Sequence, residues 1–156
     1  MNTLRTLKAK KIPFTTVEYT YSADDLSIEK IAEDNDLPVA QVFKTLVAKG
    51  DKTGVIVAVI AGNQILNLKA LAKVSGNKKI ALVAVKDLQG LTGYIRGGCS
   101  PIGMKKAFPV FFSTKALDFD TIFVNAGKRG ILMGVEPKTL AGLCRGEFAD
   151  IGQAVF

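Results

Sequence analysis

Apolar and polar positions along the chain form short blocks that follow two different periods. Seven blocks are rich in β-branched and aromatic residues and are bounded by turn residues, which is typical of β-strands. They cover residues 14–19, 43–48, 55–60, 80–85, 109–113, 121–125 and 131–135, and a weaker block at 147–151 indicates one more short strand. The glycine-bounded turn at 50–54 should join the second and third blocks into a hairpin.

Other segments repeat their apolar residues every three or four positions, as amphipathic helices do. Ser27 and Asn67 stand where N-cap residues are expected, and Gly76 stands where a helix should stop. The expected helices cover residues 3–11, 28–35 and 67–75 and a segment opened by Pro137, with a short helix at 39–42 and a turn or helical turn at 86–90.

Strands and helices are interleaved irregularly, without the strict alternation of a doubly wound parallel sheet. We therefore predict a mixed α/β (α+β) fold, in which a curved, barrel-like mixed sheet of about six or seven strands is surrounded by helices. The 156 residues, 48% of them apolar and 22% charged, suit one domain over residues 1–156. No apolar run approaches the roughly 20 residues of a membrane span. The N-terminus has no signal-peptide core, so we expect a cytoplasmic protein without membrane contact.

The absence of histidine is the most restrictive feature of the composition. It excludes Ser-His-Asp and Cys-His catalysis and every zinc motif that contains histidine. The two cysteines, Cys99 and Cys144, are too few for a four-thiolate zinc site. We therefore expect no metal and no cofactor, and any catalysis must use lysine, carboxylate, tyrosine, backbone amides or the substrate's own groups.

The formal net charge is +7, from 21 basic and 14 acidic residues. An excess of this size favours polyanions such as RNA, although it also serves solubility. Charge alone therefore supports a nucleic-acid partner only weakly.

The segment Gly93–Lys106, which we call the glycine loop, contains four of the fifteen glycines and lies between apolar, strand-like blocks. Glycine lets another group approach the backbone closely, so the pair Gly97-Gly98 can point free N–H groups at a bound oxygen. A bulge or irregular turn between strands is an equally good interpretation. The loop lacks the lysine of a phosphate-binding Walker motif, because Met104 follows Gly103.

Lys44 stands out because it lies in an otherwise apolar and hydroxyl-bearing run, residues 42–48. A solvent-facing side chain is the more frequent outcome of such a pattern. The functional interpretation places its ammonium group in a pocket, where it pairs with an anionic substrate group. Tyr19 and Cys99 fit packing roles best, and residues 125–130 fit either a solvated turn or a phosphate-binding loop.

Three segments together resemble the YbaK family of trans-acting aminoacyl-tRNA deacylases. This family includes the Cys-tRNA(Pro) deacylases and is related to the editing domain of bacterial prolyl-tRNA synthetase. The segments are Val42-Phe-Lys-Thr-Leu46, Gly93-Tyr-Ile-Arg-Gly-Gly-Cys-Ser-Pro-Ile-Gly103 and Val124-Asn-Ala-Gly-Lys-Arg-Gly130, in that order. The resemblance implies a barrel-like mixed sheet and removal of a wrong amino acid, typically cysteine, from tRNA(Pro).

By this resemblance Lys44 matches the family's essential lysine, which binds the 3′ end of the tRNA or the substrate. Gly97 and Pro101 match its G-x-x-x-P loop, Tyr19 matches a pocket aromatic, and Asn125 stands where the family usually has serine. No acidic residue follows the Lys-Arg-Gly run at the family's usual place. Together with the backbone argument, this predicts Lys44, Gly97 and Gly98 as catalytic. The predicted substrate-binding residues are Tyr19, Phe43, Ser100, Pro101, Asn125, Ala126 and Gly127, and charge and loop position add Lys105, Lys106, Lys128 and Arg129 as candidates for binding tRNA.

The mechanism that the resemblance implies suits a chain without histidine. The thiolate of the substrate cysteine attacks the ester, so the protein supplies orientation and oxyanion donors rather than a nucleophile. The partners are then the acceptor end of an aminoacyl-tRNA and, as a further candidate, prolyl-tRNA synthetase. Two alternatives stay open: a deacylase for another small amino acid such as alanine, and a non-catalytic RNA- or nucleotide-binding module.

Overall fold

The computed structural model describes residues 3–22 and 24–155. The strands are β1 (Thr15–Glu18), β2 (Phe43–Gly50), β3 (Gly54–Ala61), β4 (Gln64–Leu66), β5 (Ile80–Leu82), β6 (Val110–Ser113), β7 (Ile122–Asn125), β8 (Ile131–Val135), β9 (Glu147–Ala149) and β10 (Gly152–Ala154). The α-helices are α1 (Thr3–Ala9), α2 (Ile28–Asp34), α3 (Leu68–Ser75), α4 (Val85–Thr92) and α5 (Pro137–Cys144), and the 3-10 helices are η1 (Val39–Gln41) and η2 (Thr114–Asp118). None of the helices in the described part of the chain is long and apolar enough to cross a membrane.

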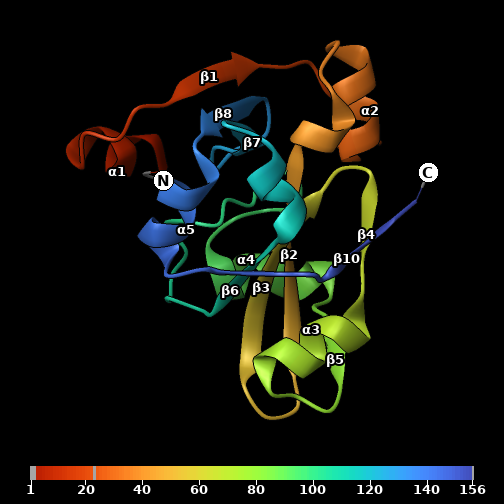
Figure 1. Ribbon diagram of the computed structural model, residues 1–156. Coiled ribbons are helices and arrows are strands. Elements are labelled where there is room, and N and C mark those ends of the chain that lie inside the picture. Colours follow the sequence, from red (N-terminus) through yellow and green to blue (C-terminus); the bar gives the residue numbers. More distant parts are fainter. Residues whose placement is uncertain (1–2, 23, 156) are drawn as a thin grey trace.

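The strands form a mixed, curved arrangement around the β2–β3 hairpin (Figure 1). The largest sheet has the order β5-β2-β3-β6-β9, in which β3, β6 and β9 are parallel and the other pairs are antiparallel. A second sheet, β1-β8-β7, meets the first through one parallel bridge between Val42 and Phe123. The described strands thus make a curved mixed sheet rather than a closed barrel, and the predicted fold class is confirmed.

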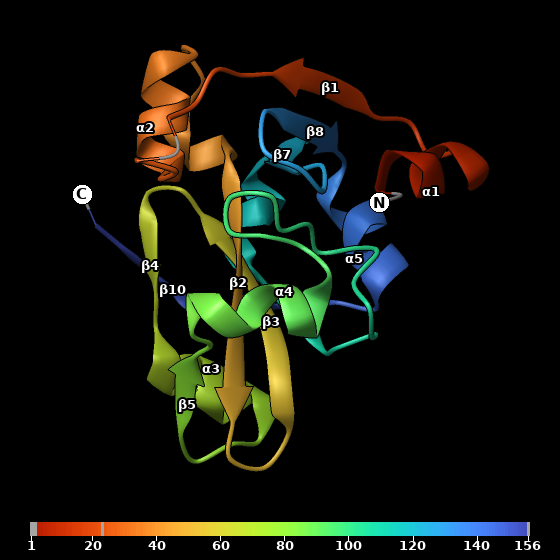
Figure 2. The same cartoon turned by 180° about the vertical axis from the view of Figure 1, so that it is seen from behind.

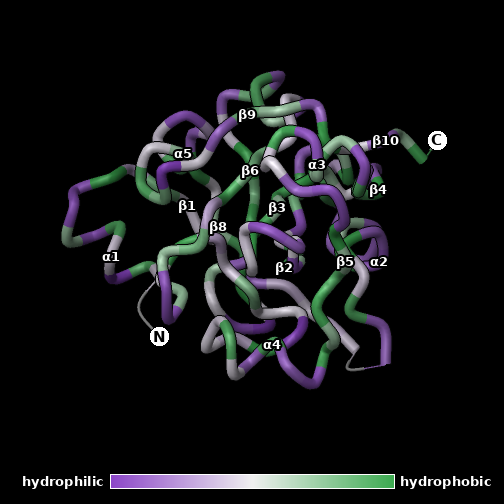
Figure 3. Tube along the Cα trace, turned by 90° about the horizontal axis from the view of Figure 1, so that it is seen from below, coloured by the Kyte–Doolittle hydropathy of each residue, from purple (hydrophilic) through white to green (hydrophobic). Residues whose placement is uncertain are grey.

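Strand β3 is the centre of the core, because it is buried on both faces. Val57 and Val59 pack in a large cluster with β6, β7, β8 and helix α5. Ile56 and Ile60 point the other way and pack against Leu71 of α3. Figures 1 and 2 show α3 and α4 on opposite faces of the hairpin, and Figure 3 shows the apolar stretches of β3 and β6 in the middle of the molecule.

Three predicted helix ends are confirmed by the local structure. Asn67 caps α3 by accepting a bond from the N–H of Ala70 at 3.0 Å, and Gly76 ends the helix in the left-handed conformation. Ser27 caps α2 through the N–H of Lys30. These polar side chains satisfy backbone groups that a helix end would otherwise leave unpaired.

Four elements differ from the sequence prediction, and one of them is the 3-10 helix η2, which was not predicted. Val85 begins helix α4 rather than ending a strand, and the predicted turn at 86–90 is part of this helix. Its Leu88 packs beside Val47, but Gly90 interrupts the apolar pattern that would have indicated a helix. Strands β4 and β10 pair with each other and were not predicted, because three residues are too few to show a period. The described residues therefore contain ten strands rather than six or seven.

The outer edge of β2 has a gap between two neighbours. β7 meets this edge only at Val42, and β5 pairs only with residues 48–50. The C=O of Val42 accepts a bond from the N–H of Gly62, so the backbone groups of Val42 point toward β3. In an antiparallel pair the direction alternates from one residue to the next. The N–H and C=O of Thr45, three residues further on, therefore point outward, into the gap. Among the described strands none pairs with Thr45 on this side, which leaves room for a cavity.

Candidate active site

A cavity of about 490 Å³ fills the gap beside β2, and we call it the β2 cavity. Its walls come from the end of β1, the start of α2, the β5–α4 connection, the glycine loop and the end of β7. The lining residues are Tyr19, Leu26, Ser27, Ile28, Glu29, Ile31, Phe43, Lys44, Thr45, Leu46, Val47, Leu82, Val83, Val85, Leu88, Arg96, Gly97, Cys99 and Asn125. A concave, mostly apolar site with a few polar groups is the usual form of a small-molecule site.

Lys44 reaches this cavity from β2 instead of pointing into bulk solvent. Its side chain is 22% exposed, and its Nζ lies 3.6 Å from Oε1 of Glu29, whose side chain is 45% exposed. The pair is loose and half-solvated, so it neutralises the ammonium without fixing it strongly. Glu29 is the nearest carboxylate to this lysine, and the sequence analysis did not place it in the site.

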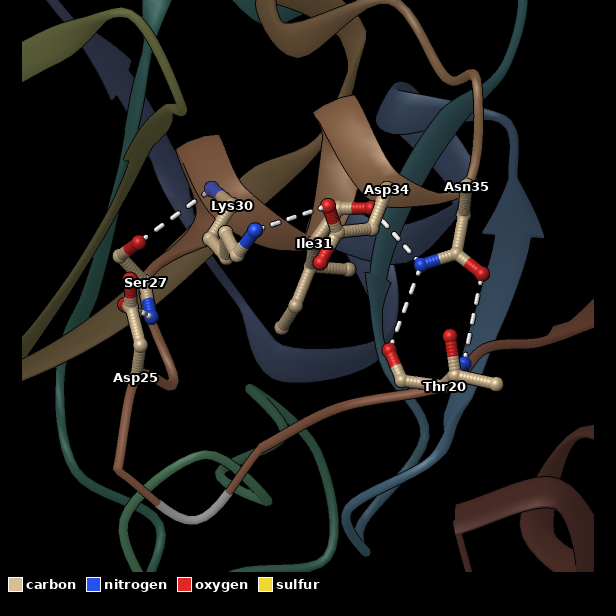
Figure 4. A network of polar contacts seen from close by, with 7 residues as sticks. All are labelled: Thr20, Asp25, Ser27, Lys30, Ile31, Asp34 and Asn35. Atoms are coloured by element: carbon tan, nitrogen blue, oxygen red, sulfur yellow. Dashed lines mark hydrogen bonds and ion pairs between the residues drawn. The ribbon is translucent and has the colours of Figure 1, made fainter.

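Helix α2 brings Glu29 to the cavity, and a polar network fixes the helix (Figure 4). The amide of Asn35 donates to the C=O of Ile31 and to that of Thr20, whose N–H in turn donates to Oδ1 of Asn35. At the other end, Asp25 accepts a bond from the N–H of Ser27. Hydrogen bonds from Ser27 hold the pKa of the Asp25 carboxyl below its ordinary value.

The glycine loop follows helix α4 and contains no strand. Tyr94 anchors it, because its buried hydroxyl donates to the C=O of Ile102 at 2.6 Å and lies 2.9 Å from the hydroxyl of Thr3. Ser100 is fully buried, and its hydroxyl accepts a bond from the N–H of Ile102. Ser100 therefore shapes the loop from inside rather than facing the cavity.

A tight turn carries the loop across the mouth of the cavity. The N–H of Gly98 donates to the C=O of Ile95 at 2.9 Å, and Gly97 has φ 83°, as the third residue of a type II turn requires. A Cβ on Gly98 would lie 3.1 Å from Cα of Lys128, so this position needs glycine for close backbone approach.

This turn corrects the predicted oxyanion donors. The N–H of Gly98 is already bonded inside the turn and is not free for a substrate. Among the described residues of the glycine loop that line the cavity, Arg96, Gly97 and Cys99 have N–H groups without an acceptor. The available amides are therefore those of Arg96, Gly97 and Cys99.

Asn125 holds three walls of the cavity together. Its Nδ2 donates to the C=O of Gly97 at 2.6 Å and to the hydroxyl of Tyr19 at 3.1 Å, and its Oδ1 accepts a bond from the N–H of Gly127 at 2.9 Å. Both amide hydrogens are thus in use, and one lone pair of Oδ1 remains. A serine hydroxyl has one hydrogen and could not make both donor contacts.

The structure brings together five of the predicted residues at the cavity: Tyr19, Phe43, Lys44, Gly97 and Asn125. The remaining predicted substrate-binding residues, Ser100, Pro101, Ala126 and Gly127, do not line it. Pro101 instead lines a separate cavity of about 260 Å³, together with Lys106.

The predicted tRNA-binding residues also have definite positions. Lys105, Lys106 and Lys128 are exposed, whereas Nε of Arg129 donates to the C=O of Arg96 at 2.9 Å and so braces the glycine loop. None of the four lines the β2 cavity.

Thr45 is a cavity residue that the sequence analysis missed. Its hydroxyl oxygen is buried and has no hydrogen-bond partner among the described residues. A buried polar atom without a partner costs about 1–3 kcal/mol, and this oxygen is too enclosed for a ligand to reach it in this conformation. Its position directly after Lys44 in a hydroxyl-bearing run was the available signal.

Cys99 faces the cavity but is a poor nucleophile. Burial raises the pKa of its thiol to about 11, so the reactive thiolate is scarce at neutral pH. It packs with Val47 and Tyr94, as the sequence analysis expected. In the part of the chain that the structure describes, no three Cys, Asp or Glu side chains gather as metal ligands would.

Comparisons with known proteins relate this fold and site to a family. A family model described as "Aminoacyl-tRNA editing domain" matches residues 24–143. EbsC of Enterococcus faecalis, named as a Cys-tRNA(Pro)/Cys-tRNA(Cys) deacylase, is 49% identical over 150 residues, which cover 96% of this chain and 92% of EbsC. A proline–tRNA ligase of Thermosipho africanus is 26% identical over 91 residues, which are 58% of this chain and 16% of the ligase.

A crystal structure described as a trans-editing enzyme for prolyl tRNA synthetase has the same fold, with a TM-score of 0.81 at 22% identity over 98% of both chains. The family model covers most of the chain, and the match to EbsC covers nearly all of both proteins. This agrees with the resemblance of the three sequence motifs to the YbaK family. The chain belongs to the aminoacyl-tRNA editing domain family.

Proposed function

We propose that the protein is a trans-acting deacylase that removes cysteine wrongly attached to tRNA(Pro), and that residues 1–156 form one deacylase domain. The observation that carries the proposal is the β2 cavity, where Lys44, Tyr19, Asn125 and the glycine loop meet. The name of EbsC, with which nearly the whole chain aligns, supports cysteine as the amino acid.

Each group at the cavity has a distinct role in this proposal. Lys44 attracts the negatively charged acceptor end of the tRNA. The free N–H groups of Gly97 and Cys99 stabilise the oxyanion that forms at the ester carbonyl, and one such donor contributes about 3–4 kcal/mol in other enzymes. Asn125 and Tyr19 keep the glycine loop at the distance that this requires.

The reaction needs no nucleophile from the protein. The substrate's own sulfur bonds to the carbonyl carbon, the bond from that carbon to the tRNA oxygen breaks, and the thiol proton ends on the departing 3′ oxygen. The products are free tRNA and a cyclic thioester, with no change in oxidation state. This chemistry suits a cavity whose only thiol has a pKa of about 11 and a chain without histidine.

Two further elements of the proposal concern where and with whom the protein acts. Aminoacyl-tRNA is made and used in the cytoplasm, so the enzyme should work there. Prolyl-tRNA synthetase is its natural companion, because a pocket that accepts proline cannot reject cysteine strongly by size alone. An enzyme that removes alanine instead is the second candidate, since the mostly apolar cavity also suits a methyl group.

The test is release of the amino acid from Cys-tRNA(Pro), Ala-tRNA(Pro) and Pro-tRNA(Pro) by the wild type and by Lys44→Ala. We expect cysteine to be released fastest and Lys44→Ala to lose at least about 30-fold in turnover, since truncating one partner of a hydrogen-bonded charge pair costs about 2–5 kcal/mol. Lys138→Ala, which removes a charge from α5, should leave the rate unchanged.

The thiol requirement separates the two substrate hypotheses. If sulfur attacks the ester, Cys-tRNA(Pro) with a methylated sulfur should not be turned over. Equal release from the methylated and the free substrate would contradict the mechanism. Binding of tRNA without release from any substrate would favour the non-catalytic module.

A further inference from the structure

A second large cavity lies at the other end of β2. It has a volume of about 600 Å³, and Lys49, Lys69, Lys78 and Lys79 line it around an apolar floor that includes Ala72 of α3. We call it the lysine groove. It lies where the β2–β3 turn, α3 and β5 meet, at the bottom of Figure 1.

The net charge of the molecule comes from the chain segment that contains the four groove lysines. Residues 44–86 contain eight lysines and one acidic residue, so this segment alone has a net charge of +7. The remaining residues contain 13 basic and 13 acidic side chains, which cancel. The excess positive charge of the protein therefore belongs to one segment and is not spread as a general aid to solubility.

The single acid of the segment, Asp51, also lines the groove but, within the described chain, forms no ion pair with its lysines. Its Oδ1 accepts bonds from the backbone N–H groups of Lys79 at 3.1 Å and Lys78 at 2.9 Å, and these bonds hold the pKa of the carboxyl below its ordinary value. Among the described residues, no carboxylate lies within 4.0 Å of the ammonium groups of the four groove lysines.

The backbone that carries these lysines is held in place. Oδ1 of Asn77 accepts bonds from the N–H groups of Lys52 and Thr53 at 2.8 and 3.0 Å, and its Nδ2 donates to the hydroxyls of Thr53 and Ser75. These bonds tie the hairpin turn to the α3–β5 connection, so the groove is formed before any ligand arrives.

The lysine groove and the β2 cavity share one short strand. Ile80 and Ala81 line the groove, whereas Leu82 lines the cavity. Lys44 and Lys49 are five residues apart on β2, so their Cα atoms are separated by about 17 Å and their side chains project from opposite faces of the strand. One strand of B-form DNA rises about 3.4 Å per nucleotide and a strand of A-form RNA rises less, so this distance corresponds to at least about five nucleotides.

We propose that the lysine groove binds the phosphate backbone of the tRNA acceptor arm, at least about five nucleotides from the 3′ end that enters the β2 cavity. The identity of the RNA rests on the proposed function. Uncompensated lysines at a preformed rim fit a polyanion, because each phosphate contact releases counterions. Continuity with the cavity favours RNA over an acidic protein segment, which the same charges could also attract.

The test compares two double variants, Lys78→Ala/Lys79→Ala and Lys49→Ala/Lys69→Ala, with the charge-matched control Lys115→Ala/Lys138→Ala. Binding of uncharged tRNA(Pro) is measured by fluorescence anisotropy at several NaCl concentrations. Each groove variant should bind about 10-fold more weakly, and its slope of log K against log salt should be smaller by about two. The control should behave like the wild type.

Unchanged affinity and slope in both groove variants would overturn the inference and leave an acidic protein as the better partner. Because the tRNA is uncharged, this result is independent of catalysis. If the groove variants deacylate Cys-tRNA(Pro) and bind tRNA as tightly as the wild type, the proposed role of the groove is wrong and the proposed reaction stands. Weakened binding by these variants, in a protein that hydrolyses no aminoacyl-tRNA, would refute the proposed reaction and support the groove.

Discussion

The two ends of strand β2 carry lysines in opposite surroundings. Lys44 lies where the outer edge of β2 has no paired strand among those described, beside a cavity, and pairs at 3.6 Å with Glu29. Lys49 lies at the end that pairs with β5, is exposed, and shares an open groove with three other lysines. Strand β2 thus carries a single, partly neutralised lysine at one end and contributes to a group of four lysines at the other.

The difference follows from what covers the edge of the strand. Where β5 stops, the edge opens into an apolar space in which one charge has a strong effect, because little water screens it. Where β5 pairs, the side chains stand in water, and several weak contacts must add up to bind a polyanion. This suggests that the first end selects and positions the ester, whereas the second contributes affinity.

An asparagine forms the main polar contacts at each end of β2. Replacing each of them by alanine tests the different roles of the two ends, and the change at Asn125 has the largest expected effect. Asn125→Ala removes the bonds to Gly97, Tyr19 and Gly127. It should lower kcat for Cys-tRNA(Pro) about 10- to 100-fold with little change in tRNA affinity, because the glycine loop loses its position. The free energy of unfolding should fall by about 1–3 kcal/mol. Asn125→Ser should recover little of kcat, because serine cannot make both donor contacts.

Asn77→Ala is the matched change at the other end. It breaks the bonds that hold the hairpin turn, so it should weaken tRNA binding while turnover of a short aminoacylated substrate stays close to that of the wild type. A loss of kcat in Asn77→Ala as large as that in Asn125→Ala would refute the division of labour. Denaturant unfolding of both variants separates lost stability from lost function.

The sequence predicted the fold where local signals were strong. The β2–β3 hairpin, the caps Ser27 and Asn67 and the stop at Gly76 are confirmed, because each depends on a few adjacent residues. Helix α4 was predicted only as a turn or helical turn at 86–90, because Gly90 breaks its period. Strands β4 and β10 were missed because strand pairs of three residues depend on tertiary contacts. Whether the strands close into a barrel likewise depends on pairing between distant segments, which the local sequence pattern does not predict.

The candidate site was predictable only in part. Lys44 and the glycine loop stand out by residue type, and the resemblance added Tyr19 and Asn125. Nothing in the sequence shows that Gly98 uses its N–H inside a turn, or that Glu29 reaches Lys44 from another element. Such contacts depend on the packing of segments that are distant along the chain.

The thiol of Cys99 reports how well the cavity end excludes water. Burial raises its pKa from the ordinary 9.0 to about 11, which favours the neutral thiol in the folded state. Below pH 9 the thiol is neutral in both the folded and the unfolded state, so it does not reduce the free energy of unfolding. Between pH 9 and pH 11 it ionises in the unfolded chain first, and the free energy of unfolding falls. At pH 10 the loss is about 1.4 kcal/mol, the equivalent of one pKa unit.

The measurement is the free energy of unfolding of the wild type and of Cys99→Ala at pH 7, 9 and 10. The variant loses some packing at every pH, but the difference between the two proteins should shrink by about 1.4 kcal/mol between pH 7 and pH 10. Cys144, whose pKa is also raised by burial, is present in both proteins and cancels. Tyr94 cancels only in part, because the charge of the Cys99 thiolate is one of the causes that raise its pKa. A difference that stays constant with pH would show that water reaches this end as freely as it reaches the lysine groove.

The smallest expected effect concerns Glu29, the acid that distinguishes Lys44 from the groove lysines. In Glu29→Gln the carboxylate no longer competes with the acceptor end of the tRNA for the ammonium of Lys44. A half-exposed pair contributes about 0–1 kcal/mol, so KM for Cys-tRNA(Pro) should fall by up to about fivefold at low salt, with kcat unchanged. Asp34→Asn is the matched control, because it removes an acid from the same helix that pairs with Lys30 at 3.0 Å and does not line the cavity. A fall in kcat for Glu29→Gln, with the control unaffected, would mean that Glu29 orients Lys44 for the reaction. The two ends of β2 would then differ in the positioning of their lysines rather than in their charge.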